Sequence, residues 1–479
     1  MENKQRLETK QGGEGGIIVD NSVETNVQLT ESSRKNRLVD GEYKKRYMSV
    51  RAKFAISLCF ATIWLFLSVF LARNWYSDLA SLTNAVFAAI VIAGVALVPG
   101  FMNAFLVSSL ILDRQPRLAN IDLVHEPVTV LIAAYNEEAG IYHSLEYIGR
   151  QSYQGAVKVI VVDNNSTDNT SEEVLRASRE LNMDIKLLSE PQRGKFNALN
   201  RGLQDIETKF FIALDADTLI HKDGLAYLMA RMKASPANVI AVAGSMLVKN
   251  SRENLITKIQ EWDYFLSIAS VKRMQGLYQG TLVAQGAFSL FKTDAIRELG
   301  GWPEAIGEDI VVTWELLAQD EKVYFEPCAV AFTTVPSTFR MFARQRARWA
   351  RGMLEGIRAV KPWQQPSLYH KVCTGFDLFI PLVDTCYTLC WIPGLVLAIF
   401  FGNYAIVGPM ALLVLPLTLV VFGILYYHQT KYVFKTLDLK VRRNFLGFVF
   451  FMFIYQAIMS PVALYGYLQE AFGARRVWK

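Results

Sequence analysis

Two carboxylates that lie close together in the sequence, Asp215 and Asp217, have the residue type and spacing of a metal site. They follow an apolar run, so a turn after a strand would point both side chains into one cleft. Carboxylate oxygens suit Mg²⁺ or Mn²⁺, and such an ion needs few protein ligands when substrate phosphates complete its shell. The alternative for an isolated Asp-X-Asp is a solvated turn, which the position after a buried strand disfavours.

Anion binding is indicated by Arg193-Gly-Lys195, which directly precedes a helix-like stretch. Backbone N–H groups at a helix start and a lysine ammonium are suited to a diphosphate. The spacing is not that of a P-loop, which needs a longer glycine-bounded loop and a Ser or Thr after the lysine. The segment therefore predicts a nucleoside diphosphate ligand, but not phosphoryl transfer of the P-loop type.

A candidate general base lies in Gly307-Glu308-Asp309, just before a helix-like stretch at 310–317. A carboxylate at a helix start is well placed to take a proton from a hydroxyl within hydrogen-bond reach. The alternative is plain N-terminal capping of the helix. The residues alone leave both interpretations open.

These groups need a scaffold that gathers them, and the surrounding pattern is that of an α/β domain. Short apolar or β-branched runs alternate with helix-like stretches, with strands expected at 128–135, 157–163 and 209–215 and helices at 138–151, 171–181 and 197–203. Such alternation predicts βαβ units and a mostly parallel sheet that binds ligands at the carboxyl ends of its strands. Polar, acid-bearing segments stand at two further strand ends, Ala134-Tyr-Asn-Glu-Glu138 and Asp163-Asn-Asn-Ser-Thr-Asp168.

Apolar runs before this domain predict membrane spans. Residues 54–72 and 84–112 are each long enough to cross a bilayer. Basic residues flank the pair on its outer sides, which puts both flanks in the cytosol. We therefore expect two transmembrane helices in 44–117, preceded by a polar, disordered cytosolic tail at 1–43.

Three further apolar runs follow the domain, at 375–401, 405–427 and 445–468. They predict about three transmembrane helices within 371–470, followed by a tail at 471–479. Three spans would leave the C-terminus outside, yet the basic residues of the tail favour the inside, and this conflict stays open. Asp377 and Asp384 indicate either an interfacial half-helix or a polar path through the first run.

An amphipathic segment, 337–370, joins the domain to these spans. Read as a helix, it separates apolar side chains such as Phe342 from a series of arginines. That pattern is typical of a helix lying on a membrane surface, and an ordinary basic connector is the alternative. The segment contains Gln345-Arg-Ala-Arg348-Trp349.

The composition of the whole chain excludes simpler architectures. With 479 residues, 52% hydrophobic and 20% charged, it is too apolar for a simple soluble enzyme and too charged for membrane spans alone. The net charge of +6 flanks the apolar segments, so we assign it to membrane orientation and expect no nucleic-acid partner. The five cysteines fit neither a disulfide framework nor a zinc pattern.

Taken in order, the motifs between Val128 and Gly352 resemble the membrane-integrated processive β-glycosyltransferases of glycosyltransferase family 2, which include cellulose, chitin, hyaluronan and poly-N-acetylglucosamine synthases. The resemblance implies an α/β GT-A domain (Rossmann-like, mostly parallel sheet) at 118–336, cytosolic and inserted between the transmembrane helices of a bacterial-type inner or plasma membrane. It implies inverting, processive transfer from a nucleotide sugar, expected to be UDP-N-acetylglucosamine, to a growing polysaccharide that is secreted across the lipid bilayer. Mg²⁺ or Mn²⁺ would be the cofactor, and an accessory export or synthase subunit is left open.

The same resemblance assigns roles to the residues that match the motifs. Donor-binding residues would be Ala134, Tyr135, Glu137, Asp163, Lys195, Asp215 and Arg348, with Asp217 on the metal. Asp309, with Glu308 beside it, would be catalytic, and Gln345, Trp349 and Phe288 would bind the acceptor.

The chain departs from the family pattern at three positions. Asn164 stands where a second acidic residue is frequent, Gly307 where threonine is usual, and Lys292 where arginine is common. These departures leave the metal pair and the base intact but put the sugar preference in doubt. The rival hypotheses are a non-processive transferase that acts on a lipid or other carrier, which the Gln345-Arg348-Trp349 pattern disfavours, and an inactive membrane scaffold, which the retained acids disfavour.

Overall fold

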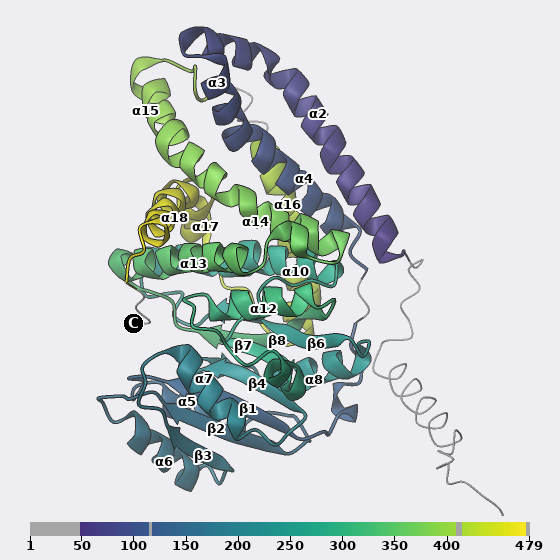
Figure 1. The fold of residues 1–479 in the computed structure, drawn as a ribbon, viewed down its shortest axis with the longest axis vertical. Helices are drawn as coiled ribbons and strands as arrows, with labels where there is room; N and C mark the ends of the chain where they lie inside the picture. Colours follow the sequence, from purple (N-terminus) through teal and green to yellow (C-terminus); the bar gives the residue numbers. More distant parts are fainter. Residues whose placement is uncertain (1–47, 115–116, 409–413, 476–479) are drawn as a thin grey trace, which may run out of the picture.

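One eight-stranded sheet, in the order β3-β2-β1-β4-β7-β6-β8-β5, forms the centre of the protein. The computed structural model describes residues 48–114, 117–408 and 414–475 (Figure 1). The predicted tail at 1–43 and the last four residues of the predicted tail at 471–479 lie outside the described residues.

The first half of the sheet is parallel, as the βαβ pattern predicts. Its strands are β1 (Val128–Ala134), β2 (Val157–Asp163), β3 (Ile185–Ser189) and β4 (Phe210–Asp215). In the register, Ala134 pairs with Asp163, and the neighbouring Ala133 pairs with Asp215. The carboxyl ends of these strands therefore lie at one edge of the sheet, where the polar motifs begin.

The second half of the sheet is mixed. It comprises β5 (Leu219–Ile220), β6 (Val239–Val248), β7 (Phe288–Lys292) and β8 (Lys322–Thr333). β7 is antiparallel to both β4 and β6, β8 is parallel to β6, and β5 is antiparallel to β8. Most of the strand pairs that join neighbours are thus parallel, and the fold class predicted from sequence is confirmed.

Helices cover both faces of the sheet and explain why its strands are continuously apolar. Val130 and Ile132 of β1 belong to one hydrophobic cluster, whereas Leu131 and Ala133 belong to the other, because successive side chains of a strand point to opposite faces. The helices of this domain are α5 (Ile141–Gly149), α6 (Thr170–Glu180), α7 (Lys195–Gln204), α8 (Gly224–Ala234), α9 (Leu255–Trp262), α10 (Ala269–Leu277), α11 (Thr293–Glu298) and α12 (Glu308–Ala318), with a 3-10 turn η2 (Ile121–Leu123) and a π-helical turn η3 (Asp263–Ile268).

Long apolar helices extend away from the sheet at the top of Figure 1. Before the domain lie α2 (Val50–Leu82), α3 (Ala85–Ile92), η1 (Ala93–Leu97) and α4 (Val98–Ile111), and after it lie η4 (Pro362–Gln364), α14 (Leu368–Cys386), η5 (Tyr387–Trp391), α15 (Ile392–Phe401), α16 (Val414–His428), η7 (Gln429–Phe434), α17 (Phe445–Phe453) and α18 (Tyr455–Ala471). Among the described residues, three continuous helices are long and apolar enough to cross a membrane, 50–82, 85–111 and 368–401. The pair α17 and α18 qualifies as a fourth if its 55° bend is counted within one span.

The predicted span at 405–427 corresponds only in part to a described helix. α16 starts at Val414, and residues 409–413 before it lie outside the described part of the chain. This span therefore stays a prediction.

A single long helix, α13 (Phe339–Ala359), separates the sheet domain from the long helices (Figure 1). Thr338 caps its start by accepting a hydrogen bond from the Met341 N–H. Its buried side packs against α12 on the sheet domain and against α18 above. Phe339 and Met341 are exposed, whereas Phe342 is buried. The apolar side chains of α13 therefore do not all lie on one face of the helix.

Candidate active site

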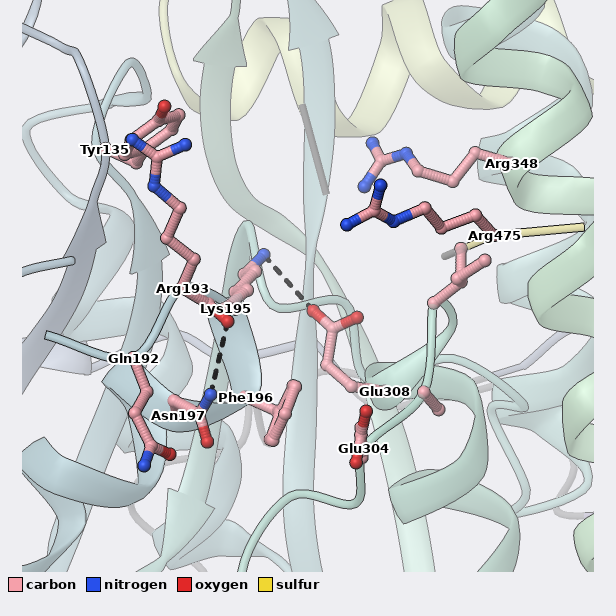
Figure 2. A pocket seen from close by; sticks show the side chains of 13 residues that line it. Tyr135, Gln192, Arg193, Lys195, Phe196, Asn197, Glu304, Glu308, Arg348 and Arg475 are labelled. Atoms are coloured by element: carbon pink, nitrogen blue, oxygen red, sulfur yellow. Dashed lines mark hydrogen bonds and ion pairs between the residues drawn. The ribbon is translucent and has the colours of Figure 1, made fainter. Parts of the chain in front are cut away.

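A cavity of about 710 Å³ opens between the sheet domain and α13. Figure 2 shows Arg193 and Lys195 on one wall and Arg348 and Arg475 extending from the opposite wall. The lining residues are Tyr135, Gln192, Arg193, Gly194, Lys195, Phe196, Asn197, Glu304, Ala305, Ile306, Glu308, Arg348 and Arg475. Four cationic side chains around one cavity favour an anionic ligand.

Lys195 links the predicted metal motif to Glu308, the neighbour of the predicted base Asp309. Its Nζ lies 2.6 Å from Asp215 Oδ1 and 3.5 Å from Glu308 Oε1. Burial by itself would lower the pKa of Lys195, but the two carboxylates outweigh that effect and raise the pKa above its ordinary value. Lys195 therefore stays charged, and it starts α7 after Gly194, whose φ of +141° suits glycine.

The loop that leads to Lys195 is held by Asn164, one of the three positions that depart from the family pattern. Asn164 is fully buried, and its side-chain amide donates to the carbonyl oxygens of Glu190 and Gln192. Its Oδ1 accepts a hydrogen bond of 2.8 Å from the Gly194 N–H. An aspartate could not donate to the two carbonyls, so the loop requires an amide here.

Glu308 and Asp309 form the first turn of α12, as predicted. Burial raises the pKa of Glu308 from its ordinary value of 4.5 to about 7, although Lys195 acts in the opposite direction. Asp309 is partly exposed, and its Oδ1 accepts a hydrogen bond of 2.9 Å from the Ile310 N–H. The pair thus offers a carboxyl that titrates near neutrality next to a more accessible carboxylate.

A carboxylate of α13 positions this turn. Glu355 is buried, and its Oε2 accepts hydrogen bonds from the Ile306 and Gly307 N–H groups at 2.7 and 3.0 Å. It satisfies amides that precede α12 and so fixes where that helix begins. Nothing in the sequence pattern distinguished Glu355 from an ordinary helical glutamate.

The donor atoms around Asp215 and Asp217 fit a divalent cation of the Mg²⁺ or Mn²⁺ type. Asp215 is the last residue of β4 and Asp217 follows it, and the Asp215 N–H donates to the carbonyl of Ala287, just before β7, at 3.4 Å. Among the described residues, there is no group of three or more His, Cys, Asp or Glu side chains that could hold a metal ion alone. Two hard oxygen donors beside a cationic cavity suit an ion whose remaining ligands come from a diphosphate.

The Gln345-Arg348-Trp349 pattern lies on α13, but its members face different surroundings. Arg348 lines the cavity, whereas Gln345 and Trp349 do not. Trp349 is 37% exposed, and its ring lies 6.3 Å from that of Tyr264. Within the described part of the chain, the buried Oε1 of Gln345 has no hydrogen-bond partner, so it remains able to accept one from a ligand.

Three further predicted donor residues, Ala134, Glu137 and Asp163, lie near the same sheet edge but do not line the cavity. Ala134 is fully buried at the end of β1, and the Glu137 N–H donates to Thr170 Oγ1 at 2.8 Å. Asp163 accepts hydrogen bonds from the Ser166 N–H and from the Ser171 hydroxyl, which orders the turn after β2. These residues shape the polar edge, whereas Tyr135, which follows Ala134, reaches the cavity.

The structure contradicts the prediction that Phe288 binds the acceptor. Phe288 is completely buried in the sheet, and a Cβ on Gly244 would come within 2.3 Å of its ring. Its ring therefore packs against backbone in the core. No strand was predicted for this segment, and alternation along β7 (Phe288–Lys292) turns this side chain into the core.

Arg475 lines the cavity, although its place in the sequence predicts only a C-terminal tail. The segment after α18 is tied to α13, because Arg351 donates to the Ala474 and Arg475 carbonyls at 2.8 and 3.3 Å. Glu470, at the end of α18, pairs with both Arg351 and Arg358. This anchoring directs Arg475 towards Arg348 (Figure 2). The only sequence signal was a run of basic residues, which membrane topology explained equally well.

Comparison with known proteins agrees with the geometry of the domain. Residues 125–352 match the family described as Glycosyltransferase like family 2. Over 242 residues, half of this chain, it is 33% identical to the poly-beta-1,6-N-acetyl-D-glucosamine synthase of Staphylococcus aureus. It is 34% identical over 229 residues to the synthase of the same name from Staphylococcus epidermidis. The chain spans 57% and 54% of these relatives, respectively.

A solved structure shares the fold over a longer range. A mannosyltransferase from Pyrobaculum calidifontis, in complex with GDP-Man and Mn²⁺, superposes with a TM-score of 0.55 at 20% identity. The match covers 81% of this chain and 99% of the other. At this identity it supports the fold alone.

Proposed function

Because residues 125–352 of this chain form a glycosyltransferase family 2 domain, we propose that the protein is an inverting and processive β-glycosyltransferase that uses UDP-N-acetylglucosamine. The observation that carries the proposal is the cationic cavity between Lys195 and Arg348, which Glu308 of α12 also lines. The sugar is proposed from the printed activity of the staphylococcal relatives.

The nucleotide would lie along the wall that contains Tyr135 and Arg193. The Arg193 guanidinium lies 5.1 Å from the centre of the Tyr135 ring, an arrangement that offers flat surfaces to a nucleobase. Its diphosphate would then reach Lys195 from one side and Arg348 and Arg475 from the other. These charges would stabilise the leaving group as negative charge develops on it.

Asp217, with Asp215 nearby, would hold a Mg²⁺ or Mn²⁺ ion, which when bound neutralises charge on the departing diphosphate. Asp215 also keeps the Lys195 ammonium aimed into the cavity through their 2.6 Å contact. The remaining donor-side assignments, Ala134, Glu137 and Asp163, stay proposals for residues at the same sheet edge that do not line the cavity.

In the proposed transfer, Asp309 accepts the proton of the acceptor hydroxyl as its oxygen bonds to the anomeric carbon. The bond between that carbon and the diphosphate oxygen breaks, and UDP leaves with the electron pair. Attack from the face opposite the leaving group inverts the configuration. Trp349 would provide a stacking surface for the acceptor's terminal sugar, and Gln345 would accept a hydrogen bond from one of its hydroxyls.

Processive extension and secretion through the chain's own apolar helices complete the proposal. The long helices and their attachment to α13 support it, since α13 touches both the site and α18. The catalytic domain would then face the cytosol of an inner or plasma membrane. Addition of a single sugar to a lipid or other carrier is the alternative, which the contact between site and apolar helices disfavours.

The test uses the full chain in isolated membranes, supplied with individual UDP-sugars and either Mn²⁺ or Mg²⁺. We expect UDP release and a high-molecular-weight product from UDP-N-acetylglucosamine, which a hydrolase specific for β-1,6-linked N-acetylglucosamine should degrade. An Asp309→Asn chain in the same membranes is the blank. Transfer of one sugar to a lipid fraction would overturn processivity, and absence of transfer from every nucleotide sugar would overturn the function.

A further inference from the structure

A buried charge network on α13 begins at Arg346, which contacts Trp349 and, like it, does not line the cavity. Arg346 is only 2% exposed, and its Nη2 donates to Asp263 Oδ2 at 2.8 Å. Asp263 starts the π-helical turn η3 and is itself buried. A buried ion pair of this kind needs a precise geometry to offset the loss of hydration of both charges.

The same network reaches the bend of the last apolar helices. The hydroxyl of Tyr455 donates to the same oxygen, Asp263 Oδ2, at 2.6 Å. Tyr455 is the first residue of α18, where the chain bends by 55° relative to α17. One carboxylate thus receives a hydrogen bond from the helix of the site and another from the bent helix pair.

Arg346 also covers one face of the Trp349 ring. The centre of its guanidinium lies 4.0 Å from the ring centroid, within the range of a cation–π contact. Among the described residues, the buried Nε of Arg346 has no hydrogen-bond partner, so no hydrogen bond offsets the burial of this polar atom. A flat group packed against the ring restricts its tilt, and the side chain is still 37% exposed, so part of its surface is accessible to a ligand.

We propose that Arg346 is a positioning residue that sets the orientation of Trp349, and that Asp263 and Tyr455 link this orientation to the bend between α17 and α18. This inference rests on the proposed function, because it concerns the surface offered to the acceptor sugar. It goes beyond that function by connecting the acceptor surface to the geometry of the apolar helices.

The first measurement does not depend on activity. The full chain is labelled with 5-fluorotryptophan, and the Trp349 resonance is assigned by its loss in Trp349→Phe. Arg346→Gln, which removes the cation but keeps a polar planar end, should shift or broaden that resonance. Arg346→Lys keeps the ion pair without the flat stacking group and should also change it, whereas the exposed neighbour Arg344→Gln should not. An unchanged Trp349 resonance in Arg346→Gln overturns the proposal.

The second measurement separates positioning from general damage. With a short β-1,6-linked N-acetylglucosamine oligomer as acceptor, Arg346→Gln should raise the acceptor KM at least about tenfold and the donor KM less than about twofold. Tyr455→Phe should cause a smaller change in the same direction, about threefold. Equal changes in both KM values would indicate a merely structural role and overturn the proposal. If the wild type transfers no sugar, the function fails, and the fluorine resonance alone decides the positioning role.

Discussion

Gly307 and Gly352 meet backbone to backbone where α12 approaches α13. A Cβ on Gly307 would lie 2.5 Å from the Gly352 Cα, and a Cβ on Gly352 would lie 2.8 Å from the Gly307 Cα. Glu355, one turn further along α13, accepts hydrogen bonds from the Ile306 and Gly307 N–H groups at this contact. The helix that carries Arg348 and the helix that carries Asp309 are therefore fixed relative to each other by a contact that tolerates no side chain.

Replacing Gly352 by alanine should force the two helices apart. Overpacking of this kind costs about 1–3 kcal/mol of stability, and we expect transfer to fall at least about tenfold because the base moves relative to Arg348. Thermal unfolding of the purified chain and UDP release would measure the two effects. Gly375→Ala is the matched control, since a Cβ there meets nothing within 4 Å. Wild-type rates in Gly352→Ala would show that the spacing of the helices is not critical.

Asp309→Asn should abolish transfer while nucleotide binding remains. The amide keeps the shape of the side chain but cannot take the acceptor proton, and loss of a general base costs about 10²–10⁴-fold in rate. Turnover and binding of UDP by calorimetry are measured on the same preparation. Asp294→Asn removes the same charge from an exposed position of α11 and should be neutral. Near-normal turnover in Asp309→Asn would contradict its assignment as the base.

The raised pKa of Glu308 predicts a pH dependence near neutrality. Below a pKa of about 7 the carboxyl is neutral, and above it a negative charge appears in the cavity that would hold the diphosphate. The interaction is on the order of 1 kcal/mol, so the donor KM should rise about fivefold as the pH increases through 7. Glu308→Gln should flatten this rise.

The same shift affects folding. The unfolded chain loses the Glu308 proton near the ordinary pKa of 4.5, before the folded chain does at about 7. The contribution of Glu308 to the free energy of unfolding is therefore fully present below pH 4.5 and is lost as the pH rises through about 7. A pH series of thermal unfolding should show this decline in the wild type and a smaller one in Glu308→Gln. Identical slopes in the two proteins would argue against burial of an ionising group here.

Arg475→Ala should weaken donor binding although the residue lies beyond the last apolar helix. Removing a charged donor to a phosphate costs roughly 1.5–3 kcal/mol, so we expect the donor KM to rise by at least about tenfold. Arg475→Lys should restore part of the affinity. Arg179→Ala, which removes an exposed arginine of α6, is the control. If the donor KM of Arg475→Ala matches the control, Arg475 does not contact the donor.

Asn164→Asp tests why this chain departs from the family pattern. An aspartate would face the carbonyl oxygens of Glu190 and Gln192 without a proton to donate, at a cost of about 1–3 kcal/mol for each unsatisfied group. We expect lower thermal stability and weaker donor binding, because the loop before Lys195 loses its anchor. Asn169→Asp makes the same charge change at an exposed position. A fully stable and active Asn164→Asp would show that the amide is dispensable.

The local pattern predicted the parallel half of the sheet closely. The strand expected at 157–163 occupies that range, and the helix expected at 197–203 lies inside α7. β6 was not predicted, because its ten residues are all buried and a mostly apolar run without alternation does not distinguish a strand from a buried helix. β3 is short and half exposed, so its alternation is weak.

Site residues could be predicted where a reactive or charged side chain follows a predicted strand. They could not be predicted where segments far apart in the sequence come together. Lys195 and Glu308 were proposed from separate motifs, and their contact depends on a fold that spacing does not specify. Glu355 and Arg475 act through partners more than 45 positions away in the chain. The acceptor-binding role predicted for Phe288 was wrong for a local reason, because a shift of a single position along a strand moves a side chain to the other face of the sheet.

The order of the strands has a consequence for synthesis on the ribosome. β7 lies between β4 and β6 in the sheet, yet it is translated after both. Until residue 292 has emerged, β4 lacks a partner on one side and β6 lacks both partners, because its other neighbour β8 is translated later still. Unpaired apolar strands of this kind promote aggregation. By then α2 and α4 have already been made, so the apolar helices exist before the sheet is complete, and only β8, the last strand in the chain, completes it.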